Sequence, residues 1–360
     1  MKKQILYTTS AIALGCAMAA PVAAQEWNVK VGGFFTGGLA YASVGGALTT
    51  GNNRNGVDML QTAEIFFLPS ITLDNGITFG VNIQLEGNTS GDQIDESFLT
   101  ISSDTLGTIT LGNENSEGYR MSSAAPTVTN MWINSPSISA YIPFSLALTG
   151  GPTFRTPLIS SFAEVGANND AARLSYRTPD FAGFKLGVSY ARDGLQDSNA
   201  SVNIGAAPGI MHDIFDVAAS YSGSFGAADV SASGRYGRAT VSGGGHNDVW
   251  GLGGTVGFGG FTVGGGYGAA SNVLAQDTKG WSLGASYDAA GPWSFALSTY
   301  QGKATNFGDR SFYRAYKLGA ARQLGTGVKL DIFAVKAEAN SPAGLNVSRY
   351  TVGTLLNLSF

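Results

Sequence analysis

The feature of this 360-residue chain that most constrains its fold is the alternation of apolar and polar side chains over short segments. In the segment FKLGVSY the large side chains share one parity: Phe184, Leu186, Val188 and Tyr190. Successive side chains of a β-strand point to opposite faces, so such a segment has one apolar and one polar face. The C-terminal segment RYTVGTLLNLSF alternates in the same way, with Leu355 as the single apolar exception on its polar side.

Alternation of this kind predicts sixteen strands after the N-terminal leader. They span about 27–42, 58–72, 77–88, 93–103, 107–113, 170–178, 183–192, 213–225, 228–240, 248–258, 260–270, 280–288, 292–302, 312–323, 327–338 and 347–360. Tight turns such as DNG (74–76) and GG (259–260) alternate with longer polar connections. This order predicts an antiparallel meander with two unlike ends. The Gly-rich stretch GGGYGAA (264–270) alternates as a strand and lacks the Lys-Ser/Thr ending of a phosphate loop.

The charged residues on the polar faces decide between a soluble and a membrane protein. Sixteen strands with charged inner faces enclose a water-filled lumen, so the apolar faces must point outward into a bilayer. Closing the sheet into a barrel also gives the backbone N–H and C=O groups of the edge strands hydrogen-bond partners within the membrane. The predicted fold class is therefore all-β, a 16-stranded antiparallel transmembrane β-barrel, with the last strand paired to the first.

The N-terminus predicts secretion. Residues 1–24 combine two lysines, an apolar stretch and small residues before Gln25, the pattern of a cleaved signal peptide. Cys16, the only cysteine, lies in this segment, so the mature chain 25–360 has no disulfide. Loss of Lys2 and Lys3 leaves 19 basic against 25 acidic residues, a net charge of −6, and no basic tract indicates nucleic acid.

Three stretches resemble Gram-negative outer-membrane general diffusion porins: NDAARLSYRTPDFAGFKLGVSYARDG, LGTITLGNENSE and the C-terminal Phe360. The resemblance implies a homotrimer of 16-stranded barrels in the outer membrane, in contact with lipid and lipopolysaccharide. It implies a third external loop, 115–169, folded inward as a constriction. It also implies that Phe360 serves as a signal for the outer-membrane assembly machinery.

A structureless connection of this length is unusual and normally functional. We expect it to narrow the lumen, with apolar pieces of MWINSPSISAYIPF packed against the wall. The candidate constriction and lumen charges are Glu64, Glu96, Glu117, Glu164, Arg173, Arg235, Lys317 and Lys30. Porins of this kind often carry arginines on the early strands, whereas here those strands carry Lys30, Glu64, Glu86 and Glu96.

These observations predict passive diffusion of small hydrophilic solutes and ions, with a weak cation preference and no enzymatic reaction. No cofactor is expected, although Asp92 and Asp95 are candidate calcium ligands. Two alternatives stay open. One is a substrate-specific channel, for which inward aromatics such as Phe34 and Phe66 are few. The other is a barrel adhesin or surface enzyme acting through external loops, where His212 and Asp213 are adjacent.

Overall fold

The computed structural model describes residues 25–47, 55–88, 93–135, 155–196, 208–305, 311–340 and 346–360. The predicted signal peptide, 1–24, lies outside the described residues, as does Asp92. Within the described ranges no helix is long and apolar enough to cross a bilayer.

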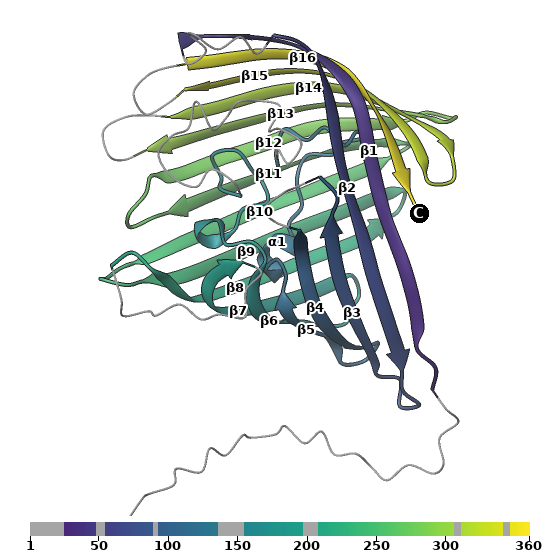
Figure 1. Ribbon diagram of the computed structural model, residues 1–360, viewed down its shortest axis with the longest axis vertical. Coiled ribbons are helices and arrows are strands. Elements are labelled where there is room, and N and C mark those ends of the chain that lie inside the picture. The colour runs from purple at the N-terminus through teal and green to yellow at the C-terminus, as the bar shows by residue number, and fades with distance from the viewer. Residues whose placement is uncertain are drawn as a thin grey trace, which may run out of the picture.

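The strands form one closed barrel in which each strand pairs antiparallel with its sequence neighbours and β1 pairs with β16 (Figure 1). The strands are β1 (Asn28–Gly45), β2 (Gly56–Thr72), β3 (Thr78–Glu86), β4 (Ile94–Ser103), β5 (Gly107–Asn113), β6 (Ala171–Arg177), β7 (Phe184–Gln196), β8 (Met211–Phe225), β9 (Ala228–Val241), β10 (His246–Phe258), β11 (Phe261–Ser271), β12 (Asp277–Asp288), β13 (Trp293–Thr305), β14 (Phe312–Gly325), β15 (Val328–Asn340) and β16 (Asn346–Ser359). All sixteen predicted strands are confirmed, and their predicted ends differ from the observed ends by no more than four residues.

Turn chemistry explains the hairpins at the tight-turn end. Gly259 and Gly260, between β10 and β11, have φ values of 58° and 83°. A two-residue hairpin with positive φ at both central positions follows the right-handed twist of the strands, and glycine reaches that region without a Cβ clash. The opposite end carries the longer connections, and we call it the long-loop end.

The barrel closes through its last residue. The N–H of Gly33 donates to the carbonyl oxygen of Phe360 at 3.0 Å, and the N–H of Phe360 donates to Gly33 at 3.1 Å. From there the register runs from Phe34 opposite Ser359 to Gly45 opposite Ser348. The Phe360 side chain is 71% exposed. The predicted pairing of the first and last strands is therefore confirmed.

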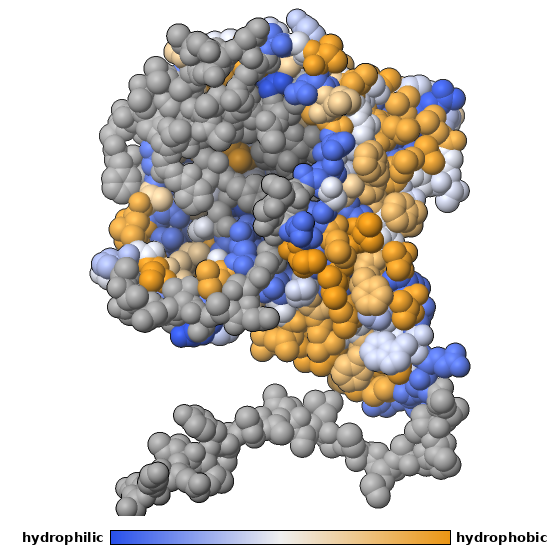
Figure 2. All heavy atoms as spheres, in the orientation of Figure 1, coloured by the Kyte–Doolittle hydropathy of each residue, from blue (hydrophilic) through white to orange (hydrophobic). Residues whose placement is uncertain are grey.

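The apolar side chains that alternate along each strand face outward. Leu186, Leu252, Leu283, Leu297 and Leu318 are each more than half exposed, although a soluble protein would bury them. Apolar residues cover much of the outer wall formed by β1–β4 in Figure 2.

Aromatic pairs mark both ends of this apolar surface. Near the tight turns, Phe184 packs on Tyr221 at 4.6 Å and Phe261 on Tyr287 at 4.3 Å between ring centroids. Nearer the long-loop end, Tyr190 packs on Phe215 at 4.8 Å and Trp250 on Tyr267 at 5.2 Å. Two aromatic girdles around an apolar band are typical of barrels that span a membrane.

Candidate pore constriction

In the connection between β5 and β6, the first arm, which follows β5, is joined to the second arm, which precedes β6. The two arms meet at the base of the loop, close to the wall. It contains α1 (Glu117–Arg120) and a short 3₁₀ helix, η3 (Val165–Ala167). Ser116 caps α1, accepting a hydrogen bond from the Tyr119 N–H at 3.2 Å. The same serine donates its N–H and its hydroxyl to the Glu164 carboxylate at 3.1 and 2.9 Å. Glu164, a predicted site residue, is thus buried where it ties the two arms together.

Helix α1 lies inside the ring of strands and contacts β6–β9 (Figure 1). The Glu117 N–H donates to Ser189 of β7 at 2.8 Å. Its carboxylate forms ion pairs with Arg177 of β6 at 2.6 Å and with Arg120 at 3.1 Å. Glu117 is 1% exposed, so this predicted lumen charge acts as a buried link between the loop and the wall.

Lys317 of β14 holds the next part of the connection. Its Nζ donates to the hydroxyls of Thr127 and Thr129 and, at 2.8 Å, to the carbonyl oxygen of Met131. Since Lys317 is 1% exposed, the loop encloses it. A buried ammonium costs free energy unless its donors are satisfied, and here three oxygens from one turn of the loop satisfy them.

Strands β15, β16 and β1 hold the same turn from its other side. The Asn130 N–H donates to Asp331 at 2.7 Å, and its side-chain amide donates to Asn357 at 2.7 Å and to Thr36 at 3.4 Å. Lys329 donates to the Val128 carbonyl oxygen at 3.1 Å. All of these wall side chains lie on the inward, polar face of their strands.

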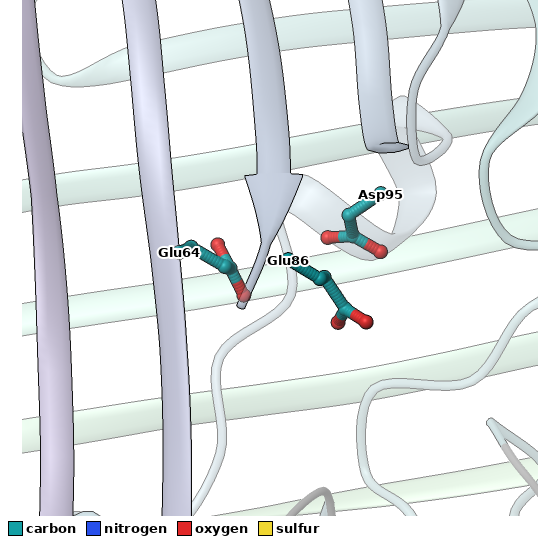
Figure 3. A group of neighbouring side chains, drawn as sticks. All are labelled: Glu64, Glu86 and Asp95. Carbon is teal, nitrogen blue, oxygen red and sulfur yellow. The ribbon is translucent and has the colours of Figure 1, made fainter. Parts of the chain in front are cut away.

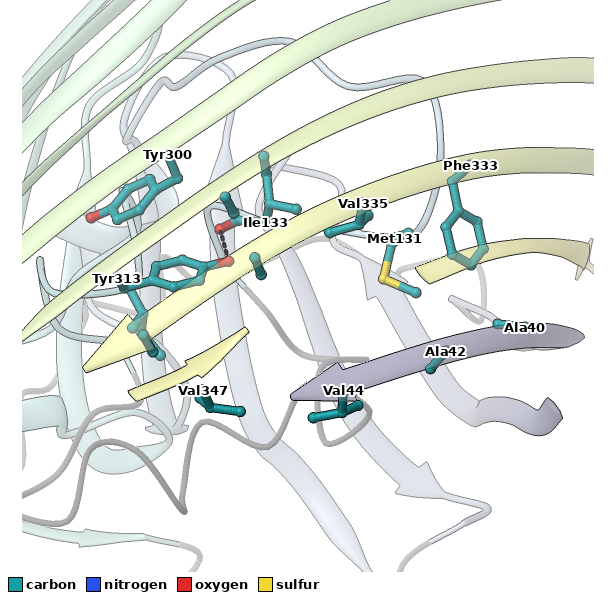
Figure 4. Close-up of a cluster of buried hydrophobic side chains, with 14 of the residues drawn as sticks. Ala40, Ala42, Val44, Met131, Ile133, Tyr300, Tyr313, Phe333, Val335 and Val347 are labelled. Atoms are coloured by element: carbon teal, nitrogen blue, oxygen red, sulfur yellow. Dashed lines mark hydrogen bonds between the residues drawn. The ribbon is translucent and has the colours of Figure 1, made fainter. Parts of the chain in front are cut away.

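An apolar cluster supports these polar contacts (Figure 4). Loop and wall contribute to it jointly, with Met131, Ile133, Leu158 and Ile159 from the loop and Tyr300, Tyr313, Phe333, Val335 and Leu355 among those from the wall. The Tyr313 hydroxyl donates to the Ile133 carbonyl oxygen at 3.1 Å, and the Tyr300 hydroxyl to that of Pro157 at 2.6 Å. Leu355, the exception in the C-terminal alternation, is therefore inward and fully buried under the loop.

Two inward glycines allow the loop to approach the wall this closely. A Cβ at Gly253 of β10 would collide with the backbone of Ser123, and one at Gly302 of β13 with the backbone of Leu158. Any larger residue at these positions would push the loop away from the strands.

Arg173 and Arg235 face the interior, as their parity predicts, and the second arm of the loop covers them. Arg173 is 3% exposed and donates to the Asn168 carbonyl oxygen at 2.8 Å. Arg235 is 8% exposed and donates to the Ala163 carbonyl oxygen and to the Asp216 carboxylate. Both arginines hold the loop, and a contribution of theirs to the open passage stays a prediction.

The inner faces of β2–β4 are different, because acidic side chains gather there (Figure 3). Glu64, Glu86 and Asp95 have carboxylate oxygens within 4.8 Å of one another, and we call these three residues the acidic strip. Glu64 and Glu86 are opposite each other across β2 and β3. All three are half-buried, whereas Lys317, Asp331 and Arg173, which bind the loop, are buried. This part of the described inner wall is therefore acidic.

A β-bulge explains the position of Asp95. The register between β3 and β4 shifts between Ile83 and Leu85, so one residue of β3 is opposite two residues of β4. A bulge places an extra side chain on the face that simple alternation assigns to its neighbour. Asp95 therefore joins Glu96 on the inner side. Glu96 itself is buried and accepts hydrogen bonds from Gln84 at 2.6 Å and from Asn115.

The base of the loop also carries Arg155 and Asp170. The Arg155 guanidinium donates to Asn115 and lies 4.1 Å from the centroid of the Tyr119 ring. Burial raises the pKa of Asp170 to about 7, although the nearby Arg155 opposes the shift. Burial likewise raises the pKa of Tyr119.

The other predicted positions lie apart from the loop. Lys30 is exposed near the tight-turn end of β1, six residues before the loop-bound Thr36. His212, expected in an external loop, instead lies within β8; its Nδ1 is 2.9 Å from Asp213, which accepts a hydrogen bond from Tyr190 at 2.9 Å. Calcium binding stays a prediction, because Asp95 lies in the acidic strip while Asp92 is outside the described residues.

Several important residues were not among the predicted site residues. Asp216, Asp331 and Asn357 bind the loop or its anchors, and Asp170 lies at its base. The alternation in the sequence places Asp216, Asp331 and Asn357 on the inward face. It does not show which of the inward polar residues the loop covers.

Solved structures of outer-membrane channels resemble this fold. The anion-selective porin from Comamonas acidovorans is 19% identical, with a TM-score of 0.63 over 93% of this chain and 100% of that one. The outer membrane channel DcaP of Acinetobacter baumannii is 12% identical, with a TM-score of 0.63 over 93% and 97%. OmpT, an outer membrane protein of Vibrio cholerae in its trimer form, is 12% identical, with a TM-score of 0.62 over 93% and 99%.

Among curated protein sequences, none matches the chain significantly. The sequence profile of the Gram-negative porins, in contrast, matches residues 8–341. The chain therefore belongs to the Gram-negative porin family of outer-membrane diffusion channels.

Proposed function

We propose that this porin lets small hydrophilic solutes and ions diffuse passively through a water-filled passage that the loop 115–169 narrows. The observation that carries the proposal is the attachment of the loop to the polar face of the closed barrel, through Lys317, Asp331 and Glu117. Diffusion through such a passage needs no reaction and no energy coupling. The protein acts in the outer membrane, after its signal peptide directs secretion and Phe360 takes part in assembly.

A weak cation preference follows from how the described charges are distributed. Several basic groups on the inner wall are held by acids, as in the Arg235–Asp216 and Lys329–Asp331 pairs, or by oxygens of the loop, as Lys317 is. The acidic strip is half-buried, and its three carboxylates lie within 4.8 Å of one another. In physiological salt the screening length is roughly 8 Å, so a cluster of carboxylates that borders a narrow passage attracts cations within it. The similar porin from Comamonas acidovorans is anion-selective, but at 19% identity its selectivity does not transfer to this chain.

Purified protein in planar bilayers tests both parts of the proposal. We expect stepwise conductance and, in a salt gradient, a reversal potential of the sign for cation preference. The triple variant Glu64→Gln, Glu86→Gln, Asp95→Asn should shift that potential toward zero. The matched control removes three acids at the tight-turn end, with Asp74→Asn, Asp104→Asn and Asp288→Asn, and should shift it far less.

Two results would contradict the proposal. A reversal potential of the opposite sign in the unmodified protein would refute the cation preference alone. Electrically silent bilayers containing correctly folded protein would refute diffusion itself and favour an adhesin or a surface enzyme. A substrate-specific channel would show saturable conductance for one solute; Phe34 and Phe66, 6.1 Å apart, are the inward aromatic pair on the early strands.

We further propose that the protein is a homotrimer. The similar Vibrio cholerae OmpT is described in a trimer form, and the exposed apolar outer faces of the strands can pack against another copy or against lipid.

A further inference from the structure

Three aromatic rings lie together on the connection between β5 and β6. The Phe162 ring is 5.9 Å from the Tyr119 ring and 6.1 Å from the Trp132 ring, measured between centroids. A backbone hydrogen bond holds the two arms of the loop side by side here, since the Ser161 N–H donates to the Asn134 carbonyl oxygen at 2.8 Å. We call Tyr119, Trp132 and Phe162 the aromatic face.

Trp132 is turned away from the wall of the barrel. Its neighbours Met131 and Ile133 are 1% and 2% exposed and belong to the apolar cluster that loop and wall share. Trp132 lies between them in the sequence and is only half-buried. Because both neighbours point toward the wall, the indole ring lies on the other side of the loop, which faces the lumen.

Phe162 and Tyr119 lie in similar surroundings. Ser161 donates a hydrogen bond to β12 at 2.9 Å, and the Ala163 carbonyl oxygen accepts one from β9. A Cβ at Gly118 would collide with side chains of β8 and β9. The residues next to these two rings thus contact the wall, while the rings themselves are half-buried. All three rings of the aromatic face therefore border the lumen.

The aromatic face is chemically suited to a cation and to another ring. The flat side of an aromatic ring carries partial negative charge, so it attracts cations, and it packs favourably against other rings. One such contact is present within the chain, because the Arg155 guanidinium lies 4.1 Å from the centroid of the Tyr119 ring. Phe162 and Trp132 meet edge to face, at an interplanar angle of 74°, and both stay half-exposed. A cation that carries a ring can therefore contact these two side chains.

The acidic strip lies across the lumen from the aromatic face. The strip is on β2–β4 (Figure 3), whereas Ser161, next to Phe162, binds β12. Strands β4 and β12 are separated by half of the sixteen-strand ring. A solute that passes between them meets carboxylates on one side and aromatic rings on the other. An ammonium group attached to an aromatic ring complements both sides at once.

We propose that the aromatic face binds organic cations that carry an aromatic ring while they cross the passage. The ring of the solute packs on Phe162 and Trp132, and its ammonium group is directed toward the acidic strip. Tyr119 supports Phe162 from the side and shares its own ring with Arg155. The proposal rests on the diffusion function proposed above and names a class of solute that the passage favours.

Block of the potassium chloride current in planar bilayers tests the proposal. Three solutes are compared: 2-phenylethylammonium, its saturated counterpart 2-cyclohexylethylammonium, and the anion 3-phenylpropionate. We expect 2-phenylethylammonium to reach half-maximal block at a concentration about two- to tenfold lower than 2-cyclohexylethylammonium, the factor that an aromatic pair contributes beyond the burial of apolar area. The anion should require a higher concentration than either cation.

Variants separate the contribution of the rings from that of the charge. Trp132→Leu with Phe162→Leu keeps apolar side chains but should bring the ratio of the two cations' half-blocking concentrations close to one. The matched control, Trp250→Leu with Phe215→Leu, removes one indole and one phenyl ring from the outward face, where they are 42% and 56% exposed, and should keep the original ratio. Neutralising the acidic strip should raise the half-blocking concentrations of both cations and keep their ratio.

A ratio of one in the unmodified protein would overturn the proposal, and so would a ratio that survives Trp132→Leu with Phe162→Leu. Stronger block by 3-phenylpropionate than by 2-phenylethylammonium would overturn it as well. If the double variant fails to fold, Phe162→Leu alone removes the central ring and should lower the ratio in the same direction. Silent bilayers would refute the diffusion function itself, whereas a conducting channel without a preference for the aromatic cation refutes only the binding by the aromatic face.

Discussion

Lys317 shows how a single residue can connect the wall to the loop. Its buried ammonium group donates hydrogen bonds to the hydroxyls of Thr127 and Thr129 and to the carbonyl oxygen of Met131. Replacing the lysine therefore leaves those oxygens without their donor. Removing one partner of a buried polar contact costs roughly 1–3 kcal/mol per unsatisfied group. The cost falls on the attachment of the loop and not on the strands, whose backbone pairing is unaffected.

We therefore predict that Lys317→Met loosens the loop while the barrel still assembles. Single-channel recordings should show a larger or noisier conductance than those of the unmodified protein. Lys185→Met is the control, since Lys185 is half exposed near a tight turn and pairs with the exposed Asp180 at 3.6 Å. Identical traces for Lys317→Met and the unmodified protein would show that this lysine does not hold the loop.

Asp170 makes a pH-dependent contribution to the free energy of unfolding. Burial raises its pKa to about 7, above the ordinary value of 3.8. A raised carboxyl pKa means that the folded protein holds a proton that the unfolded chain releases. The stabilising contribution is therefore complete below about pH 4 and is lost as the pH rises through 7, by at most about 4 kcal/mol.

We predict that Asp170→Asn weakens the dependence of heat stability on pH. Between pH 5 and pH 8 the unfolding temperature of the unmodified protein in detergent should fall more than that of the variant, because the amide does not ionise. Asp74→Asn, in an exposed turn, should keep the original slope. Equal slopes for Asp170→Asn and the unmodified protein would contradict the assignment.

At the scale of elements, the loop and the strands it crosses form one packed unit. The hydroxyl of Ser161 in the second arm donates to that of Ser282 in β12 at 2.9 Å. Cysteines at this pair would bring two sulfur atoms close together from the loop and the wall. The only native cysteine, Cys16, lies in the predicted signal peptide, so an engineered pair has no competing thiol in the mature chain.

We predict that Ser161→Cys with Ser282→Cys forms a disulfide under mild oxidation. Because the loop is already docked, oxidation should leave the conductance close to its original value, and reduction should not change it. Mass spectrometry of a digest detects the cross-link, and each single cysteine variant is the control. Two free thiols after oxidation would mean that the loop does not rest against β12.

The strands themselves were predictable because their signal is local. Strand β5 was predicted at 107–113 and observed at Gly107–Asn113, where a tight turn and a two-residue period bound it. The bulge in β4 was not predictable, because it depends on how β3 and β4 align and not on the alternation of either strand. Its consequence, the inward position of Asp95, was therefore missed as a lumen feature.

At the scale of the whole molecule, the proposed homotrimer predicts how many copies of the barrel assemble in the membrane. We predict that chemical cross-linking of the protein in native membranes gives a trimer that heat dissociates to monomers. Cross-linking after dilution of the purified protein into detergent at low concentration serves as the control for random encounters. Recovery of monomers alone from native membranes would contradict the trimer.

The sequence by itself determined the wall of this porin: sixteen strands, the parity that faces outward, the tight turns and the pairing of the last strand with the first. These features follow from neighbours within a few residues, since side-chain alternation and turn dihedrals are local properties. Only the tertiary structure decided which inward charges the loop covers. Arg173, Arg235 and Lys317 are buried by segments far away in the chain, and the acidic strip stays half-buried because the described part of the loop attaches elsewhere. Burial depends on what packs against a residue, and a period of two says nothing about that.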